Sequence, residues 1–297
     1  MWSEAEMLEL EEARPVRRTG ARSLAGAVRV EIAERNVVRA RGFEHELTRG
    51  GTPTVIYAPE GTRHGNFVEA SYRRIMARPE WSKRLTKAHT AKRQAGRTGA
   101  EEEVRGWREL DAATSSDALL MNVFCYPRVP GKRLTALLGV ERDREGGVEA
   151  EFGVRAGAKL ERGLVDRTEI DMRLGGLLVE AKLTEGDFGR APMRMVERYV
   201  AFAEVFEREA LEVGARGVVG YQLVRGVLAA EAAGAGFCVM CDGRRRDLVE
   251  EWYGVMRAVR SCEVRSRLRL VTWQEIAGAV PEGLRGFLGE KYGIVAG

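Results

Sequence analysis

Three charged residues interrupt two apolar segments whose pattern is otherwise typical of buried β-strands. Asp171 lies within IDMRL, and Glu180 and Lys182 lie within LLVEAKL. Because side chains along a strand point alternately to its two faces, Glu180 and Lys182 share one face and Ala181 points to the other. Carboxylates that lie close together repel each other unless a cation intervenes, and Mg2+ prefers oxygen ligands. The three residues therefore predict a divalent-metal site on one face of a sheet.

The predicted site suits the hydrolysis of a phosphodiester bond. A divalent metal lowers the pKa of water and offsets the negative charge of the transition state. A lysine beside it can orient or deprotonate the attacking water. The alternative is structural, with Asp171 and Glu180 forming ordinary salt bridges to Arg173 or Lys182. An acid two residues before a lysine is expected about once by chance in a chain of this composition, so the triplet is a weak motif by itself.

A predicted hairpin brings the three residues together. Its strands are expected over residues 164–174 and 177–183, and Gly175-Gly176 between them favours a tight turn. Asp171 then lies almost opposite Glu180. A further strand is expected over residues 148–154, where VEAEFGV alternates as a half-buried strand does.

A helix is expected over residues 118–126, preceded by hydroxyl side chains and ended by Pro127. Ser115 and Ser116 are interpreted as helix caps and not as nucleophiles, because no histidine or GxSxG turn accompanies them. Asn122 is the polar exception on this apolar helix.

The second half of the chain alternates between helices and strands. Helices are expected over 192–213, 217–233 and 245–259, and buried strands over 237–241 and 268–273, before C-terminal helices. Strands first in a meander and later alternating with helices predict an α/β protein with a mixed central β-sheet flanked by helices. The first hundred residues are expected to be mainly helical and irregular.

Composition narrows the class of protein. The N-terminus MWSEAEMLELEEA carries carboxylates where a signal peptide carries positive charge, and no apolar run approaches the roughly 18 residues of a membrane span. We therefore expect a cytoplasmic protein without a membrane partner. Cys238 and Cys241 form a CxxC pair inside a strand-like segment with no second pair nearby, which favours core packing over a zinc site.

Basic residues concentrate between residues 63 and 97, where ten Lys or Arg accompany two Glu. Such a segment can neutralise phosphates, and its Tyr72 and Trp81 can stack on bases. The alternative is a solvated helix face whose Phe67, Ile75, Trp81 and Leu85 dock against the rest of the protein. His64 and His89 also lie in this stretch and can touch phosphate. The candidate nucleic-acid contacts here are Arg73, Arg74, Lys83, Arg84, Lys87 and His89.

Several stretches together resemble the PD-(D/E)xK nuclease superfamily, and most closely a bacterial branch of restriction-type endonucleases. They are HGNF (64–67), WSKRLTKAHT (81–90), SSDALLMN (115–122), RTEID (167–171), VEAKLTEGDF (179–188), YQLVR (221–225) and EKYGI (290–294). The resemblance implies a restriction-endonuclease-like core with the element order α-β-β-β-α-β. It implies Asp171 and Glu180 as ligands of Mg2+, with Mn2+ able to replace it, and Lys182 as the catalytic lysine.

The same resemblance extends the site beyond the motif. Glu151 matches a glutamate of the branch and is a candidate further acidic ligand. Gln222 matches a polar position beside the site, where it can orient Lys182 or a phosphate, with helix packing as the alternative. Ser115, Ser116 and Asn122 on the first helix become candidate nucleic-acid contacts, whereas Asp117 stands where the branch has glutamine.

The expected organisation has three parts: an N-terminal extension (1–62), a basic helical region (63–110) and a nuclease-like domain (111–297). The expected function is Mg2+-dependent endonucleolytic cleavage of DNA. The alternative is a non-catalytic nucleic-acid-binding protein that keeps the nuclease fold. Cutting both strands of a duplex would favour a homodimer.

Overall fold

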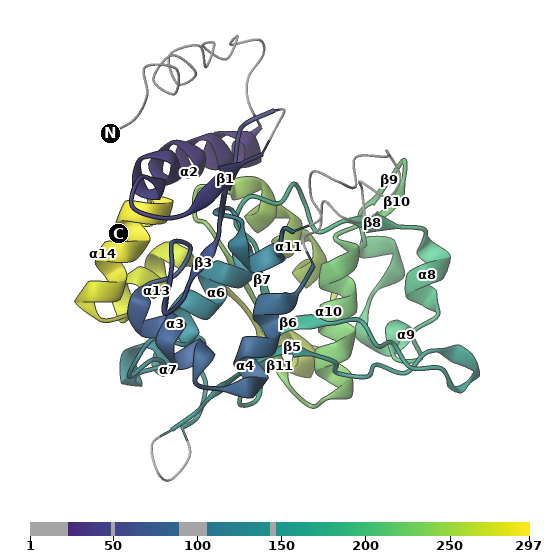
Figure 1. Ribbon diagram of the computed structural model, residues 1–297. Helices are drawn as coiled ribbons and strands as arrows, with labels where there is room; N and C mark the ends of the chain where they lie inside the picture. Colours follow the sequence, from purple (N-terminus) through teal and green to yellow (C-terminus); the bar gives the residue numbers. More distant parts are fainter. Residues whose placement is uncertain (1–22, 49–50, 89–105, 143–146) are drawn as a thin grey trace.

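A five-stranded mixed β-sheet forms the centre of the protein. The computed structural model describes residues 23–48, 51–88, 106–142 and 147–297 (Figure 1). The strand order is β12-β11-β7-β6-β5, with antiparallel pairing from β5 to β7 and parallel pairing from β7 to β12. The strands are β5 (Ala150–Val154), β6 (Ile170–Leu174), β7 (Leu177–Ala181), β11 (Gly236–Cys241) and β12 (Leu268–Thr272).

The predicted hairpin is confirmed. Leu174 pairs with Leu177 across the loop Gly175-Gly176, and Met172 pairs with Val179. Gly175 has a φ of 55°, a left-handed conformation that glycine adopts without strain. The first strand is shorter than expected and begins at residue 170, because the segment before it is irregular.

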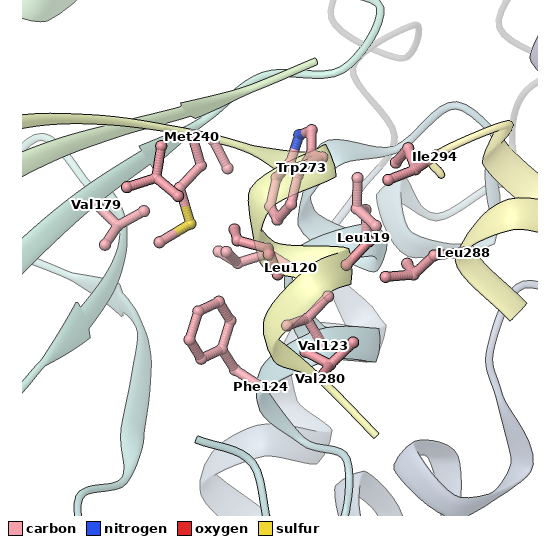
Figure 2. Packing of buried hydrophobic residues seen from close by; sticks show 14 of the residues in the cluster. Leu119, Leu120, Val123, Phe124, Val179, Met240, Trp273, Val280, Leu288 and Ile294 are labelled. Carbon is pink, nitrogen blue, oxygen red and sulfur yellow. The ribbon is translucent and has the colours of Figure 1, made fainter. Parts of the chain in front are cut away.

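Two apolar layers cover the faces of the sheet, as an α/β protein requires. On one face, Val179 and Met240 meet Leu120 and Trp273 (Figure 2). On the other face, Leu178 packs in a second cluster with residues of the helices that precede and follow β11. The first layer contains α6 (Ser116–Phe124), α7 (Lys132–Leu138), α13 (Trp273–Ala279) and α14 (Glu282–Tyr292). The second contains α10 (Tyr221–Ala232), α11 (Arg246–Ala258) and α12 (Cys262–Ser266). The predicted α/β class and mixed sheet are confirmed.

The N-terminal part joins a helix to short strands. Helix α2 lies against α14 (Figure 1). The pairs β1–β2 and β3–β4 were not expected from the sequence, because each strand has only two or three residues. The elements are α2 (Leu24–Ala40), β1 (His45–Leu47), β2 (Val55–Tyr57), β3 (Pro59–Glu60) and β4 (Arg63–His64).

The basic segment docks through its apolar side. Phe67, Tyr72, Ile75, Trp81 and Leu85 are buried in one cluster with residues of α6. Since Tyr72 and Trp81 are buried, their rings are not open to stacking on bases, and the docking alternative holds for these side chains. The segment forms α3 (Glu69–Met76), α4 (Pro79–Ser82), η1 (Lys83–Thr86) and, after residue 105, η2 (Glu109–Asp111).

The single helix predicted over residues 192–213 was wrong. The backbone N–H of Val200 donates to the carbonyl of Lys159 (3.1 Å), and the N–H of Glu161 donates to that of Arg198 (2.8 Å). These bonds to a distant segment interrupt the helical ladder. Gly217 then approaches the Ala191 carbonyl so closely that a Cβ would lie 2.1 Å from its oxygen, and α10 begins only at residue 221. The region contains β8 (Arg190–Ala191), α8 (Met193–Glu197), α9 (Phe202–Val205), η4 (Arg208–Ala210), β9 (Val213–Gly214) and β10 (Gly217–Val219).

The CxxC pair lies inside the sheet. Cys238 belongs to one apolar layer and Cys241 to the other, because they lie three positions apart along β11, an odd step that turns the side chains to opposite faces. Burial raises the pKa of both thiols to about 12. The geometry therefore agrees with the core-packing interpretation. Among the described residues, no helix combines the length and apolarity needed to cross a membrane.

Candidate active site

A charged cleft of about 530 Å³ opens where β7 ends and α6 and α10 begin. The three motif residues on the sheet lie in its wall. The lining residues are Lys87, Ala88, Glu109, Ser116, Asp117, Thr168, Glu169, Asp171, Glu180, Ala181, Lys182, Glu185, Gln222 and Arg225.

The cleft brings together Asp171, Glu180 and Lys182. The hairpin pairs Met172 with Val179, so the same register continued by one residue places Asp171 opposite Glu180. The Asp171 carboxylate accepts a hydrogen bond from the backbone N–H of Ala181 (2.8 Å). The Lys182 ammonium lies 2.8 Å from a Glu180 carboxylate oxygen, and both side chains are buried. The predicted clustering of these three groups is therefore present in the structure, and it includes the Lys182–Glu180 salt bridge considered as the alternative.

The pKa values of Asp171 and Lys182 are both raised, but for different reasons. Burial raises the pKa of Asp171 well above its usual value, and the nearby carboxylates of Glu180 and Asp117 raise it further. Burial lowers the pKa of Lys182, but Glu180, Glu185 and Asp171 outweigh that effect and raise it. Lys182 is therefore a firmly held cation paired with Glu180, and its charge only partly offsets the effects that raise the pKa of Asp171.

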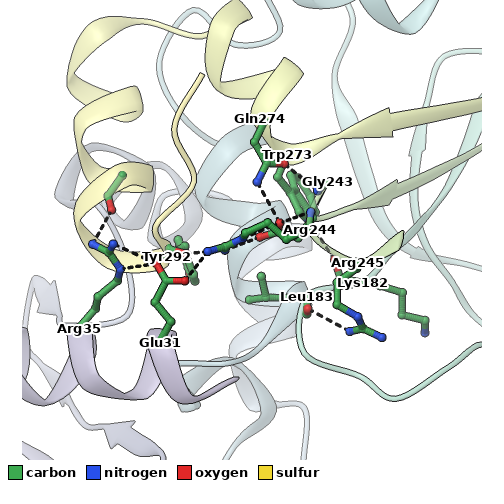
Figure 3. A network of polar contacts seen from close by, with 12 residues as sticks. Glu31, Arg35, Lys182, Leu183, Gly243, Arg244, Arg245, Trp273, Gln274 and Tyr292 are labelled. Carbon is green, nitrogen blue, oxygen red and sulfur yellow. Dashed lines mark hydrogen bonds and ion pairs between the residues drawn. The ribbon is translucent and has the colours of Figure 1, made fainter. Parts of the chain in front are cut away.

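The backbone around Lys182 is fixed from three sides, and Figure 3 shows Trp273 and Arg245 beside it. The Lys182 N–H donates to the Met240 carbonyl of β11 (2.8 Å), and the Trp273 indole N–H donates to the Lys182 carbonyl (2.9 Å). The fully buried Arg245 donates to the carbonyls of Glu185 (2.7 Å) and Gly186 (3.0 Å). These bonds hold the loop that follows β7 and orient the residues it carries toward the cleft.

Residues of α6 divide between capping, packing and the cleft. Ser115 is the N-cap and accepts a hydrogen bond from the N–H of Ala118 (3.1 Å), as expected. Asn122 is fully buried, accepts from the N–H of Val68 (2.8 Å) and donates to the carbonyls of Asn66 and Ala118 (2.9 Å each). These contacts assign Ser115 and Asn122 to the protein interior, which removes the surface that nucleic-acid contact requires. Ser116 lines the cleft and donates to Glu185.

Two of the predicted nucleic-acid contacts bind a carboxylate of the protein instead. Arg84 lies 3.0 Å and Lys87 lies 2.5 Å from the same Asp117 oxygen. Arg84 also pairs with Glu169, and its side chain is 11% exposed. Lys87 is 34% exposed and lines the cleft. Arg84 is therefore engaged in ion pairs within the protein, whereas Lys87 is partly exposed in the wall of the cleft.

The other basic candidates lie outside the cleft. Arg73 is exposed and pairs with Glu69, and Lys83 is exposed. Arg74 donates to the carbonyl of Tyr126 (2.9 Å). His64, considered as a phosphate contact, is instead buried and lies 3.0 Å from Asp111. His89 lies outside the described residues.

Glu151 and Gln222 have different positions relative to the cleft. Glu151 is exposed on β5, pairs in register with Arg173 and does not line the cleft. Gln222 lines the cleft from the first turn of α10. The structure therefore brings Gln222, and not Glu151, to the three motif residues.

Glu185 and Arg225 are two of the cleft residues that were not predicted from the sequence. Glu185 lies in the stretch VEAKLTEGDF, three residues after Lys182, and its carboxylate accepts from the N–H of Leu183 (2.6 Å). Arg225 lies three residues after Gln222, a spacing that places both on one helix face. That spacing was the available signal for Arg225.

Among the described residues that line the cleft, acids outnumber bases. Six of these residues carry carboxylates, against the cations Lys87, Lys182 and Arg225. Within the described residues, no group of three or more His, Cys, Asp or Glu is arranged to hold a metal ion. A carboxylate pair such as Asp171 and Glu180 nevertheless fits Mg2+, which commonly takes one or two carboxylates and keeps several waters. The donor set is unsuited to zinc, which prefers nitrogen and sulfur ligands.

The fold and the cleft define an α/β protein with a buried cluster of acids and a lysine. Residues 38–293 match the sequence model of the family described as "Restriction Endonuclease associating with ARP". The chain therefore belongs to this family of restriction endonucleases. No curated protein and no solved structure matches the chain.

Proposed function

We propose that this protein is a Mg2+-dependent endonuclease of the PD-(D/E)xK type that hydrolyses phosphodiester bonds of DNA. The observation that carries the proposal is the convergence of Asp171, Glu180 and Lys182 in one open cleft. The order α6, β5, β6, β7, α10, β11, with short elements between, also agrees with the α-β-β-β-α-β core of that superfamily. Membership in a restriction-endonuclease family supports the same reaction class.

Asp171 and Glu180 would hold the metal ion. Burial raises the pKa of Asp171 and the charge of Glu180 raises it further, so the pair has a reason to take up a cation. When bound, Mg2+ or Mn2+ supplies Lewis-acid stabilisation of the charge that develops on the phosphoryl group and makes water more acidic. Protons compete with the ion for Asp171, so metal affinity is expected to fall as pH falls.

Lys182 acts as a fixed hydrogen-bond donor in this proposal. Its pKa is raised, so it carries a positive charge at neutral pH. Glu180 orients the ammonium from one side at 2.8 Å, which leaves its other donors for the attacking water or a phosphate oxygen. Gln222, on the facing wall, would help to position the same phosphate.

DNA is the proposed substrate, and two further partners follow from the same reading. The exposed Arg73 and Lys83 and the partly exposed Lys87 are positive groups suited to the DNA backbone. The family description names an association with ARP, and we extend that association to this chain. Cutting both strands of a duplex requires two sites, which favours a homodimer.

Cleavage assays test the proposal directly. Supercoiled plasmid and single-stranded DNA are incubated with the protein in Mg2+, Mn2+ or EDTA. Nicking is expected with either metal and not in EDTA. Asp171→Ala, Glu180→Gln and Lys182→Ala are expected to lose about 10²-fold or more of the rate.

Glu151→Gln is the matched control, because it removes an acid on the same sheet that does not line the cleft. It is expected to cut at the wild-type rate. Full activity in Asp171→Ala or Lys182→Ala contradicts the proposal. DNA binding without cleavage under every metal condition would instead support the non-catalytic alternative.

A further inference from the structure

Arg225 differs from Lys87 and Lys182, which also line the cleft, in how its charge is neutralised. Lys182 lies 2.8 Å from Glu180 and Lys87 lies 2.5 Å from Asp117. The carboxylate paired with Arg225 is Asp166, at 4.0 Å from Nε, beyond hydrogen-bond distance. The Arg225 Nε is buried without a hydrogen-bond partner among the described residues. A cleft-lining guanidinium thus keeps donor capacity that the protein does not use.

Asp166 holds Arg225 by charge and not by a close hydrogen bond. Its carboxylate already accepts from the N–H (2.8 Å) and hydroxyl (2.5 Å) of Thr168 and from the Tyr199 hydroxyl (2.6 Å). Burial raises the pKa of Asp166, but these hydrogen bonds outweigh burial and lower it, so the group stays ionised. The Tyr221 ring lies 5.8 Å from the guanidinium carbon and adds a cation–π contact. Arg225 is therefore supported from within the protein while it lines the cleft.

Such a group would favour the binding of an anionic substrate in this cleft. Among the described lining residues there are six carboxylates, and the cations Lys87 and Lys182 each lie within 3 Å of one of them. A phosphodiester therefore meets net repulsion unless some positive charge is available to it. The planar guanidinium fork matches two phosphate oxygens at once, and an amide side chain can add a further donor.

We propose that Arg225 and Gln222 form a phosphate-binding subsite that holds a polynucleotide phosphodiester beside Asp171, Glu180 and Lys182. The subsite deepens the proposed function and rests on it for the identity of the reaction. It recognises the backbone of the nucleic acid and not its bases, so its contribution is independent of sequence.

Binding without cleavage tests the subsite separately from catalysis. Fluorescence anisotropy of a labelled oligonucleotide is measured in EDTA and again with Ca2+, over a series of salt concentrations. Arg225→Ala is expected to weaken binding and to reduce the slope of log K against log salt by about one, the loss of one phosphate contact. Arg225→Lys is expected to recover part of the affinity, because it keeps the charge without the fork.

Arg285→Ala is the matched control, since it removes an exposed arginine of α14 that does not line the cleft. It is expected to leave the salt slope unchanged. If Arg225→Ala binds the oligonucleotide with unchanged affinity and an unchanged salt slope, the proposed subsite is wrong. Thermal unfolding of each variant verifies that the fold is kept, and Arg225→Lys keeps the test decisive if Arg225→Ala does not fold.

Competition identifies the source of the phosphate. Unlabelled oligonucleotide is expected to compete far better than inorganic phosphate or a mononucleotide at the same phosphate concentration. Equal competition by inorganic phosphate contradicts a polynucleotide subsite. Arg225-dependent binding without any cleavage would contradict the proposed nuclease activity and support the subsite. Cleavage at the wild-type rate with unchanged binding in Arg225→Ala would support the nuclease activity and contradict the subsite.

Discussion

Asp171 and Glu180 differ in how their negative charges are compensated. Glu180 has the Lys182 ammonium at 2.8 Å, whereas the hydrogen bond described for Asp171 comes from the neutral N–H of Ala181. The raised pKa of Asp171 reflects burial first and the neighbouring carboxylates second. The protein thus maintains an unfavourable charge where a cation is expected to bind, a cost that active sites commonly carry.

Asp171→Asn is expected to make the metal-free protein more stable at neutral pH. The folded pKa of Asp171 lies above its unfolded value, so the ionised group disfavours folding above the folded pKa, and the penalty vanishes below the unfolded pKa of about 4. A gain in the free energy of unfolding is expected at pH 7, and it is expected to disappear at acidic pH, where the carboxyl group is protonated in both states. Urea unfolding at pH 7 and at acidic pH measures it. A less stable variant at pH 7 contradicts the assignment.

Mg2+ is expected to stabilise the wild-type protein and not Asp171→Asn. A ligand that binds only the folded state at 100 times its Kd adds about 2.7 kcal/mol. Thermal unfolding with and without Mg2+ measures the shift in Tm, and Glu151→Gln is expected to retain it. An equal shift in the Tm of Asp171→Asn would indicate that the metal binds away from the motif residues.

Helix α10 links the cleft to the core at the scale of elements. Its first five residues include Gln222 and Arg225, which line the cleft, and the next residue, Gly226, lies against Phe237 of β11. A Cβ at Gly226 would lie 2.2 Å from the Phe237 ring. The absence of a side chain at this position therefore sets how closely the helix approaches the sheet.

Gly226→Ala is expected to destabilise the protein by about 1–3 kcal/mol, because overpacking of the core outweighs the better helix propensity of alanine. Cleavage is expected to weaken as well, since α10 must shift. Gly286→Ala in α14 is the control, because no atom lies within 4 Å of its added Cβ. That change is expected to stabilise the protein by up to about 1 kcal/mol. Denaturant unfolding compares the two, and equal effects would refute the packing argument.

The sequence predicted those elements whose signals are local. The two-glycine loop set the hairpin register and so placed Asp171 opposite Glu180. The pairing of Val200 with Lys159 involves residues distant in the chain, so periodicity alone favoured an unbroken helix there. Arg84 and Lys87 were interpreted as phosphate contacts because their partner, Asp117, becomes adjacent only in the folded protein.

At the scale of the whole molecule, N-terminal and C-terminal elements are joined through buried polar groups. Lys291 of α14 is fully buried and donates to Asn36 of α2 (2.8 Å) and to the Ala113 carbonyl (3.3 Å). Its Nζ lies 4.4 Å from the Tyr292 ring centroid. Burial lowers the pKa of Lys291 well below its usual value. Arg244 adds a second link, pairing with Asp242 (2.6 Å) and with Glu31 of α2 (Figure 3).

The stability difference between wild type and Lys291→Met is expected to depend on pH. The folded pKa of Lys291 lies below the unfolded value of about 10.4, so the unfolded wild type binds more protons between them. Lys291 therefore lowers the free energy of unfolding most at pH values below its folded pKa, and this destabilisation decreases as pH rises. Between neutral pH and about pH 9, the free energy of unfolding of the wild type is expected to increase relative to that of Lys291→Met. Urea unfolding of both proteins along a pH series measures this, and a constant difference would contradict a neutral buried lysine.

Strand β7 has neighbours on both sides, antiparallel β6 on one and parallel β11 on the other. Glu180 and Lys182, at the end of β7, are therefore held by a strand that is paired on both sides. The loop after β7 and the first turns of α6 and α10 form the rim of the cleft. Divergence among relatives is expected to follow that division. A lineage can exchange rim residues to acquire a new target while the machinery on β7 stays as inherited.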